Sequence, residues 1–203
     1  ENVTGEQEAD ITAAIHKAAA VVIGPGLGQE AGAERLLDLV LQEAEKLPEL
    51  PVVIDADGLN LLAKKRLYST LGRQYVLTPH LREMSRLSGK SVQEIADDMT
   101  SAVMGQQAGA TIVLKDARTL VSDGDWLYIN LSGNSALSTG GSGDVLSGMI
   151  GGLLAQGCTQ RTAATLAVYM HGLTAEQYCE SALPHCMLAR DILEMIPKIG
   201  GNS

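Results

Sequence analysis

A single carboxylate, Asp144, follows a cluster of glycine and hydroxyl residues at 138–143, and an apolar stretch comes directly after it. Glycines in front of a helix let the backbone curl its N–H groups around an anion, and the helix dipole adds favourable potential there. Gly140, Gly141 and Gly143 are therefore predicted to form a phosphate cradle. An N-terminal cap alone does not explain these glycines, and a carboxylate beside a phosphate repels it unless it has a chemical role. Asp144 is therefore predicted to be a general base that deprotonates a hydroxyl attacking phosphorus.

The apolar stretch after Asp144 is predicted to be a buried helix that holds the cradle in place. One face carries Val145, Leu146, Met149, Ile150, Leu153 and Leu154. Glycines weaken a helix by roughly 1 kcal/mol each. Gly148, Gly151 and Gly152 are therefore expected to mark a face on which another element packs closely.

Strand and helix patterns alternate along the rest of the chain. Apolar runs at 18–24, 51–55, 74–78 and 110–115 predict buried strands, and the pattern at 30–46 predicts a helix. A short helix is expected at 58–65, and the capping box from Ser91 to Glu94 predicts a helix that continues to about Gly109. Asp123-Gly124 predicts a hairpin turn. Together these patterns indicate an α/β fold with a mainly parallel sheet, covered on both faces, and an edge hairpin.

Polar and glycine-rich residues gather where each predicted strand ends. They occupy positions 24–28, 55–60, 78–80 and 115–119. Ligands of such sheets bind outside the carboxyl ends of the strands, so the four clusters are expected to converge on one site. The glycines at 24–28 do not fit a dinucleotide fingerprint, because the third follows the second by two positions rather than three.

Composition narrows the classes of partner. The 203-residue chain carries a net charge of −9 and is 45% hydrophobic. This argues against nucleic acid and anionic membrane surfaces as partners, and no uncharged apolar run is long enough to span a bilayer. The three cysteines lack metal-site spacing and are expected to be reduced thiols of a cytoplasmic protein. No metal-ligand cluster is predicted.

Several motifs in order resemble one family. They are VVIGPGLG, VVIDADGLNLLA, VLTPHLREMSRL, IVLKDARTLV and NSALSTGGSGDVLSGMIGGLLAQG, then HG and MLARDIL. The set is similar to the ADP- or ATP-dependent NAD(P)H-hydrate dehydratases, and the stretch STGGSGDVLSG is similar to the signature of ribokinase-like kinases. The resemblance spans roughly 18–197. It implies a ribokinase-like three-layer α/β/α sandwich as a single domain over 1–203, and repair of hydrated NADH or NADPH with ADP or ATP and Mg²⁺ as cofactors.

The resemblance also implies roles for individual residues. Asp144 would lie at the substrate hydroxyl and Gly143, with Gly140 and Gly141, at the nucleotide. His80 and Gly26 would contact the hydrated dinucleotide, and Asn60 and Glu83 are expected in the same cleft. The AMP part would be held by Lys115, Asp116, Ala117, Arg118 and Thr119. Mg²⁺ would be carried mainly by the nucleotide phosphates.

The chain also departs from the family pattern. Leu81-Arg82 stand where relatives have Pro-Gly, and Asp116 stands where they have Gly. The family's domain normally begins earlier, so the domain is expected to be N-terminally incomplete. A second chain could supply the missing strands, and an open sheet edge favours a homo-oligomer.

Two other functions stay open at this point. The same Asp144 would serve a kinase for a small vitamin precursor that releases a stable phosphate ester. A non-catalytic nucleotide-binding fragment would also fit a chain without its first strands. The residues do not distinguish ADP from ATP, or hydrated NADH from hydrated NADPH.

Overall fold

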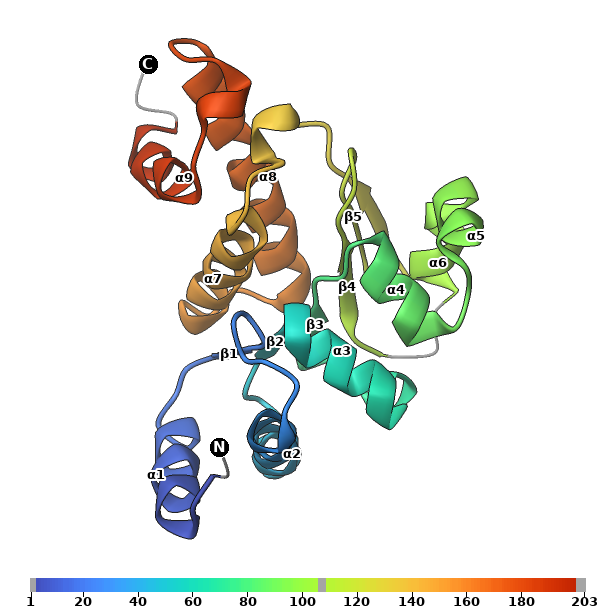
Figure 1. Cartoon of the computed structure of the whole chain (residues 1–203), viewed down its shortest axis with the longest axis vertical. Helices are drawn as coiled ribbons and strands as arrows, with labels where there is room; N and C mark the ends of the chain where they lie inside the picture. Colours follow the sequence, from blue (N-terminus) through green and yellow to red (C-terminus); the bar gives the residue numbers. More distant parts are fainter. Residues whose placement is uncertain (1–2, 106–108, 200–203) are drawn as a thin grey trace.

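The computed structural model describes residues 3–105 and 109–199, which build one sheet between two layers of helices (Figure 1). The strands are β1 (Val21–Ile23), β2 (Val52–Ile54), β3 (Tyr75–Leu77), β4 (Thr111–Leu114), β5 (Leu120–Ser122) and β6 (Leu127–Ile129). They lie side by side in chain order. β1 to β4 are parallel, whereas β5 and β6 run antiparallel to their neighbours. The four parallel strands and the edge hairpin are therefore confirmed.

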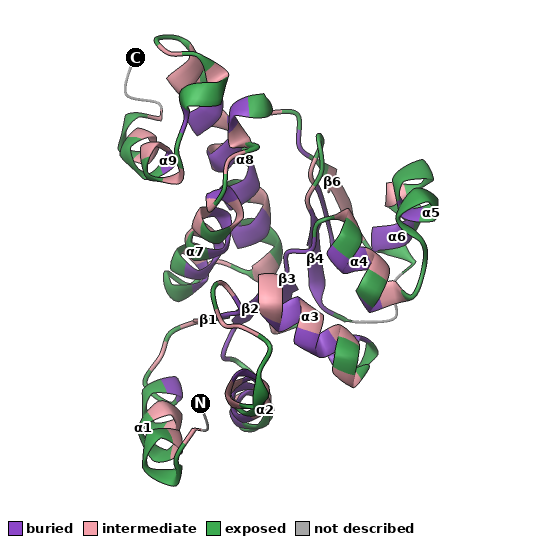
Figure 2. Ribbon diagram, in the orientation of Figure 1, coloured by how far each residue is buried: buried purple, intermediate pink, exposed green. Residues whose placement is uncertain are grey.

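Side chains of each strand alternate between two apolar cores. Val53, Val76, Val113 and Val121 face one core, which is completed by α7 (Ser142–Ala155) and α8 (Gln160–Cys179). Ile54, Leu77 and Ile112 face the other, which is completed by α2 (Ala31–Lys46), α3 (Ala56–Lys65) and α4 (Leu81–Ser88). Figure 2 shows the buried residues concentrated on the strands and on the sides of α7 and α8 that face them. The result is the three-layer α/β/α sandwich that the sequence predicts.

Two helical regions differ from the prediction. α1 (Gly5–Ile15) was not expected, although a capping box formed by Thr4 and Gln7 opens it, and it packs on α2. The single helix predicted from Ser91 to about Gly109 is wrong: α5 (Val92–Asp97) and α6 (Met99–Met104) are separated at Asp98. The Asp98 carboxylate accepts the Ser101 N–H at 2.9 Å, so it starts a new helix instead of continuing the first. Positions 106–108 of the predicted helix lie outside the described residues.

The glycines of α7 do not all pack closely. A Cβ on Gly151 would stand 2.4 Å from Cγ2 of Val22, so β1 and α7 approach each other there as expected. Gly148 and Gly152 meet open space instead, which corrects the expectation for these two positions. β1 forms one edge of the described sheet, and its Val22 is 40% exposed.

The C-terminal part carries α9 (Ala189–Met195), which packs on α7 and α8. Cys158, Cys179 and Cys186 are free thiols. Among the described residues, no helix combines the length and the apolar character needed to cross a bilayer.

Candidate active site

Polar residues from neighbouring parallel strands meet at one edge of the sheet. The loop at 24–28 follows β1, Asp55 follows β2, His80 follows β3, and Lys115 follows β4. His80 and Lys115 form a parallel bridge, in which the Lys115 N–H donates to the carbonyl of Pro79 at 2.8 Å. The carboxyl ends therefore converge, as the sequence predicts for a ligand site.

A buried ion pair lies at the centre of this edge. Asp55 is 1% exposed and accepts from Lys115 Nζ at 2.9 Å and from the Ala56 N–H at 2.8 Å. Its other carboxylate oxygen accepts from the Ser147 hydroxyl of α7, whose oxygen also lies 3.0 Å from the carbonyl oxygen of Gly143. Removing water strengthens such charge-assisted bonds. The network therefore holds the Lys115 ammonium beside the first turn of α7.

The first turn of α7 is built to face an anion. Its N-cap, Gly141, has φ +85° and no side chain to cap the helix. Across residues 3–105 and 109–199, the N–H groups of Gly143 and Asp144 donate no hydrogen bond. Lys115 Nζ lies 3.3 Å from the point where a Gly143 Cβ would stand. Free amides, the helix dipole and an ammonium together favour phosphate at this point.

The same turn is anchored from behind by a buried histidine of α8. His171 Nε2 lies 3.1 Å from the carbonyl of Ser142 and 3.2 Å from its hydroxyl. The carbonyl can only accept, so Nε2 carries the proton. Burial lowers the pKa of His171 to about 4, with a smaller contribution from the Lys115 charge, although the bond to Ser142 opposes the shift. The imidazole is therefore neutral near pH 7 and adds no charge behind the anion site.

A cavity of about 730 Å³ opens in front of these groups. Six of the predicted site residues line it, namely His80, Lys115, Asp116, Ala117, Thr119 and Gly143. Residues that were not predicted as site residues complete the wall, among them Asn130, Asn134, Thr139, Ser142, Leu146 and His171. Arg118, Gly140 and Gly141 belong to the same loops but do not line the cavity.

Asp144 lies outside this cavity, on another side of α7. It is exposed and shares a helix face with Gly148 and with Gly151, which packs on Val22 of β1. Gly143, one residue earlier, faces Lys115 and the cavity. The first turn of α7 therefore separates the cavity from the side of the molecule where β1 and its following loop lie.

That following loop is tightly constrained. A Cβ on Gly24 would stand 1.8 Å from the carbonyl oxygen of Asp55, so only glycine fits there. The Gly28 N–H donates to Asp57 at 3.0 Å. Gly26, with φ +66°, faces open space. The loop is thus fixed at both ends and leaves Gly26 accessible.

His80 and Glu83 form a reciprocal cap at the start of α4. His80 Nδ1 accepts the N–H groups of Arg82 and Glu83 at 3.1 and 3.2 Å, and buried Glu83 accepts the His80 N–H at 2.8 Å. Because Nδ1 accepts, the proton of the neutral ring is on Nε2, which lies 3.5 Å from Glu83 Oε1. Glu83 thus orients His80, and the half-exposed ring keeps one donor at the cavity.

Asn60 lies apart from the other predicted residues. Its amide bonds Asp57 at 3.5 Å and Arg86 at 2.8 Å, and it lines a separate hollow with Gln29 and Lys64. The structure therefore does not bring Asn60 to the cavity that His80 and Lys115 share.

The donor set suits a metal ion carried by a ligand rather than a resident one. Within the described part of the chain, no three His, Cys, Asp or Glu side chains gather as metal ligands. Mg²⁺ commonly keeps several waters and binds through substrate phosphates with few protein ligands. Asp116 places one carboxylate residue on the cavity wall.

Comparison with known proteins identifies the family of this chain. Residues 1–198 match the model of a family described as NAD(P)H-hydrate dehydratase. The chain belongs to this family. An ADP-dependent (S)-NAD(P)H-hydrate dehydratase of Neisseria meningitidis is 44% identical over 167 residues, which cover 79% of this chain and 55% of the relative.

Solved structures agree with the family assignment. The ADP/ATP-dependent NAD(P)H-hydrate dehydratase of Bacillus subtilis, co-crystallised with ATP and Mg²⁺, is 30% identical with a TM-score of 0.74, over 89% of this chain and 63% of that one. A ribokinase-like superfamily protein of Enterococcus faecalis is 30% identical with a TM-score of 0.81, over 96% of this chain and 66% of that one. The fold is therefore ribokinase-like. The chain spans about a third to somewhat less than two thirds of the length of the curated relatives it matches.

Proposed function

We propose that this chain forms the catalytic part of a protein that dehydrates hydrated NADH or NADPH and consumes ADP or ATP. The first turn of α7 carries the proposal: free amides and Lys115 face the cavity on one side, and Asp144 projects on another. Such a turn can hold a terminal phosphate in the cavity and present it to a hydroxyl bound near Asp144. Family membership supports the same substrates.

In this mechanism Asp144 accepts the proton of the ring hydroxyl, and the hydroxyl oxygen attacks the terminal phosphorus of the nucleotide. The bond between the terminal phosphorus and the bridging oxygen breaks. ATP thus gives ADP as the leaving group, and ADP gives AMP. The ring nitrogen's electron pair then expels the phosphorylated oxygen as inorganic phosphate, and the neighbouring ring carbon loses a proton to the departing phosphate or to water, which restores dihydronicotinamide. A nucleotide-bound Mg²⁺ would share the phosphate charge when present.

The chain's own groups have separate parts in this scheme. The Gly143 and Asp144 amides and Lys115 stabilise the transferring phosphoryl group, and Asp55 and Ser147 hold Lys115 in place. Asp116, Ala117 and Thr119 flank the nucleotide, with Arg118 on the outer side of the same loop. His80 donates from Nε2 to the hydrated dinucleotide, and Gly26 leaves room for it.

Product analysis tests the function directly. The intact protein is incubated with hydrated NADH or NADPH and with ADP or ATP. Recovery of dihydronicotinamide absorbance together with one inorganic phosphate per turnover supports the dehydratase. A stable phosphate ester without phosphate release would show a kinase, and no turnover with any of the four combinations would exclude the dehydratase.

We also propose self-association through β1, which forms one edge of the sheet in the described part of the chain. Val21 and Val22 are apolar, Val22 is 40% exposed, and no charge or proline protects this strand. Sedimentation velocity of the intact protein should show an oligomer, and Val22→Lys should shift it toward the monomer. A monomeric wild type would exclude this part of the proposal.

A further inference from the structure

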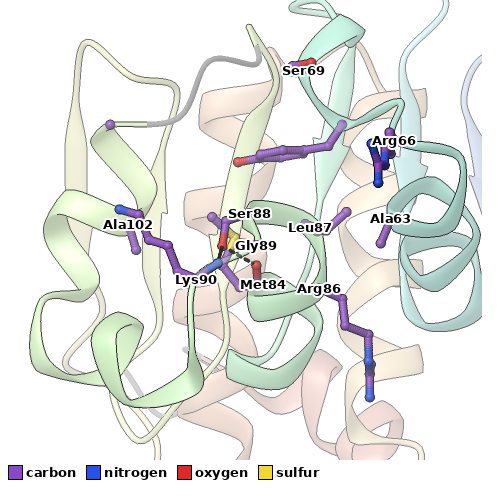
Figure 3. A pocket seen from close by; sticks show the side chains of 12 residues that line it. Ala63, Arg66, Ser69, Met84, Arg86, Leu87, Ser88, Gly89, Lys90 and Ala102 are labelled. Atoms are coloured by element: carbon purple, nitrogen blue, oxygen red, sulfur yellow. Dashed lines mark hydrogen bonds between the residues drawn. The ribbon is translucent and has the colours of Figure 1, made fainter.

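A second hollow, of about 610 Å³, lies among α3, α4 and α6 (Figure 3). Its floor is apolar and buried, made by Met84, Leu87 and Ala102. Figure 3 shows Arg66 and Lys90 on opposite sides of Met84 and Ser88. We call this hollow the basic cleft. No carboxylate is among the described residues that line it.

The charges of the basic cleft are unusual for this protein. The chain has 24 acidic and 15 basic residues, so most cations find a carboxylate. Among residues 3–105 and 109–199, the lysines and arginines without a carboxylate within 4.0 Å are Lys17, Arg66, Arg82, Arg86, Lys90, Arg118 and Lys198. Three of these, Arg66, Arg86 and Lys90, line the basic cleft. Arg86 donates to the Asn60 amide, at 2.8 Å. Hydrogen bonds with Ser91 and Ser101, and to a smaller extent the Lys90 charge, lower the pKa of Glu94 and Asp98, so Lys90 is partly neutralised. Arg66 and Arg86 have no carboxylate within 4.0 Å in the described part of the chain, and they leave positive charge beside the apolar floor.

The backbone at Arg66 adds a second argument. Arg66 is the C-cap of α3 and has φ +56°, a left-handed conformation that glycine or asparagine adopts most readily. The α3 C-terminus already has Lys64 and Lys65 in its last turn, so the helix dipole does not require another cation. An arginine in this strained position places a long guanidinium side chain at the wall of the cleft.

The basic cleft is separate from the nucleotide cavity. Asp55 caps the N-terminus of α3 and His80 caps that of α4, both at the edge described above, whereas the cleft lies at the opposite ends of these two helices. An eight-residue helix such as α4 is about 12 Å long. The two sets of lining residues have no member in common.

We propose that the basic cleft binds a small organic anion, with an apolar body on Met84 and Leu87 and one carboxylate or phosphate group between Arg66 and Lys90. Arg66 can chelate two oxygens of such a group, and Lys90 supplies a point charge. Burying the apolar body against the floor adds affinity that inorganic phosphate lacks. This site is independent of the dehydratase function proposed above.

Binding of 1-naphthyl phosphate to the intact protein tests the proposal, measured by calorimetry with and without saturating ADP. 1-Naphthoate replaces the phosphate by a carboxylate, and 1-naphthol removes the charge. The test variant is Arg66→Asn with Lys90→Gln, since asparagine tolerates the left-handed backbone. The control variant is Lys17→Gln with Lys198→Gln, which removes two exposed, unpaired cations elsewhere.

We expect saturable binding of 1-naphthyl phosphate or 1-naphthoate that ADP does not displace and that the test variant weakens at least about tenfold. The control variant should bind as the wild type does, and 1-naphthol should bind far more weakly. The difference between the two anions shows which head group the cleft prefers. Displacement by ADP, equal affinity for 1-naphthol, an unchanged test variant, or no saturable binding would each overturn the proposal. Neither result depends on whether the protein dehydrates nicotinamide hydrates.

Discussion

Lys115 Nζ and Asp55 Oδ1 lie 2.9 Å apart, although 60 positions separate the two residues in the chain. The carboxylate is almost fully buried, and Ser147 of α7 donates to its other oxygen. One ion pair thus joins β2, β4 and α7 at the point where the nucleotide phosphates are proposed to bind. Any change at this pair should affect both folding and ligand binding.

Lys115→Met should destabilise the protein strongly, because it leaves the Asp55 carboxylate buried without its ion partner. Breaking one side of a buried pair costs about 3–5 kcal/mol. Lys64→Met is the matched control, since Lys64 pairs with Glu34 at an exposed site, where water screens the charges and the loss should be small. Urea unfolding without nucleotide measures both. Equal losses for the two variants would contradict a buried, energetically important Asp55–Lys115 pair.

Gly143→Ala should weaken nucleotide binding more than it weakens folding. The new Cβ would stand 3.3 Å from Lys115 Nζ, so the flexible ammonium can move aside, but it then leaves the phosphate position. We expect at least about a tenfold rise in the Kd for ADP. Gly148→Ala, one turn further along α7 and facing open space, should leave the Kd unchanged and stabilise the helix by about 1 kcal/mol. An unchanged Kd for Gly143→Ala would place the phosphate elsewhere.

His171 should make the free energy of unfolding depend on pH. Its pKa in the folded protein is about 4, below the ordinary value of 6.5, because burial disfavours the charged ring. As the pH falls, the unfolded chain therefore takes up this proton at a higher pH than the folded protein does. The stabilisation that neutral His171 contributes is complete above about pH 6.5 and is lost as the pH falls toward 4. The shift corresponds to roughly 3 kcal/mol.

Urea unfolding of the wild type and of His171→Gln, at several values between pH 7.5 and 4, isolates this contribution. The free energy of unfolding of the wild type minus that of His171→Gln should decrease as the pH falls. A difference that stays constant across this range would show that His171 does not titrate as described.

Neighbouring glycines of α7 should respond in opposite directions. Gly151→Ala forces a methyl group to within 2.4 Å of Val22 and should destabilise by about 1–3 kcal/mol. Gly152→Ala meets no atom within 4 Å and should stabilise by about 1 kcal/mol. Thermal unfolding of the two variants measures the contrast. Stabilisation by both would mean that β1 and α7 are not in close contact at Gly151.

Local patterns were sufficient to predict most of the fold. The strands, the edge hairpin and α2 follow from apolar periodicity and turn residues, which act over a few positions. α1 was missed although Thr4 and Gln7 form a capping box, and the break at Asp98 was missed because an aspartate can either cap a helix or lie within one.

The site was predictable only in part. The glycine-rich turn and Lys115 are visible in the sequence, because composition marks them. The partners that orient them are not: Ser147 bonds Asp55 across 92 positions, and His171 bonds Ser142 across 29. Such pairs depend on strand order and on how α7 and α8 pack, and neither is encoded in local spacing. Asp55 ends a predicted strand, and that position was the available signal.

The most direct test of the account is the Asp144→Asn variant of the intact protein, assayed for recovery of dihydronicotinamide and for binding of ADP. Asp10→Asn on α1, also exposed, is the control. A positioned general base contributes about 10²–10⁴-fold, so the dehydration rate should fall by at least about 10²-fold. The affinity for ADP should stay the same or increase, because a negative charge beside the phosphate is removed. Dehydration at the wild-type rate by Asp144→Asn would contradict the central claim that this carboxylate activates the substrate hydroxyl.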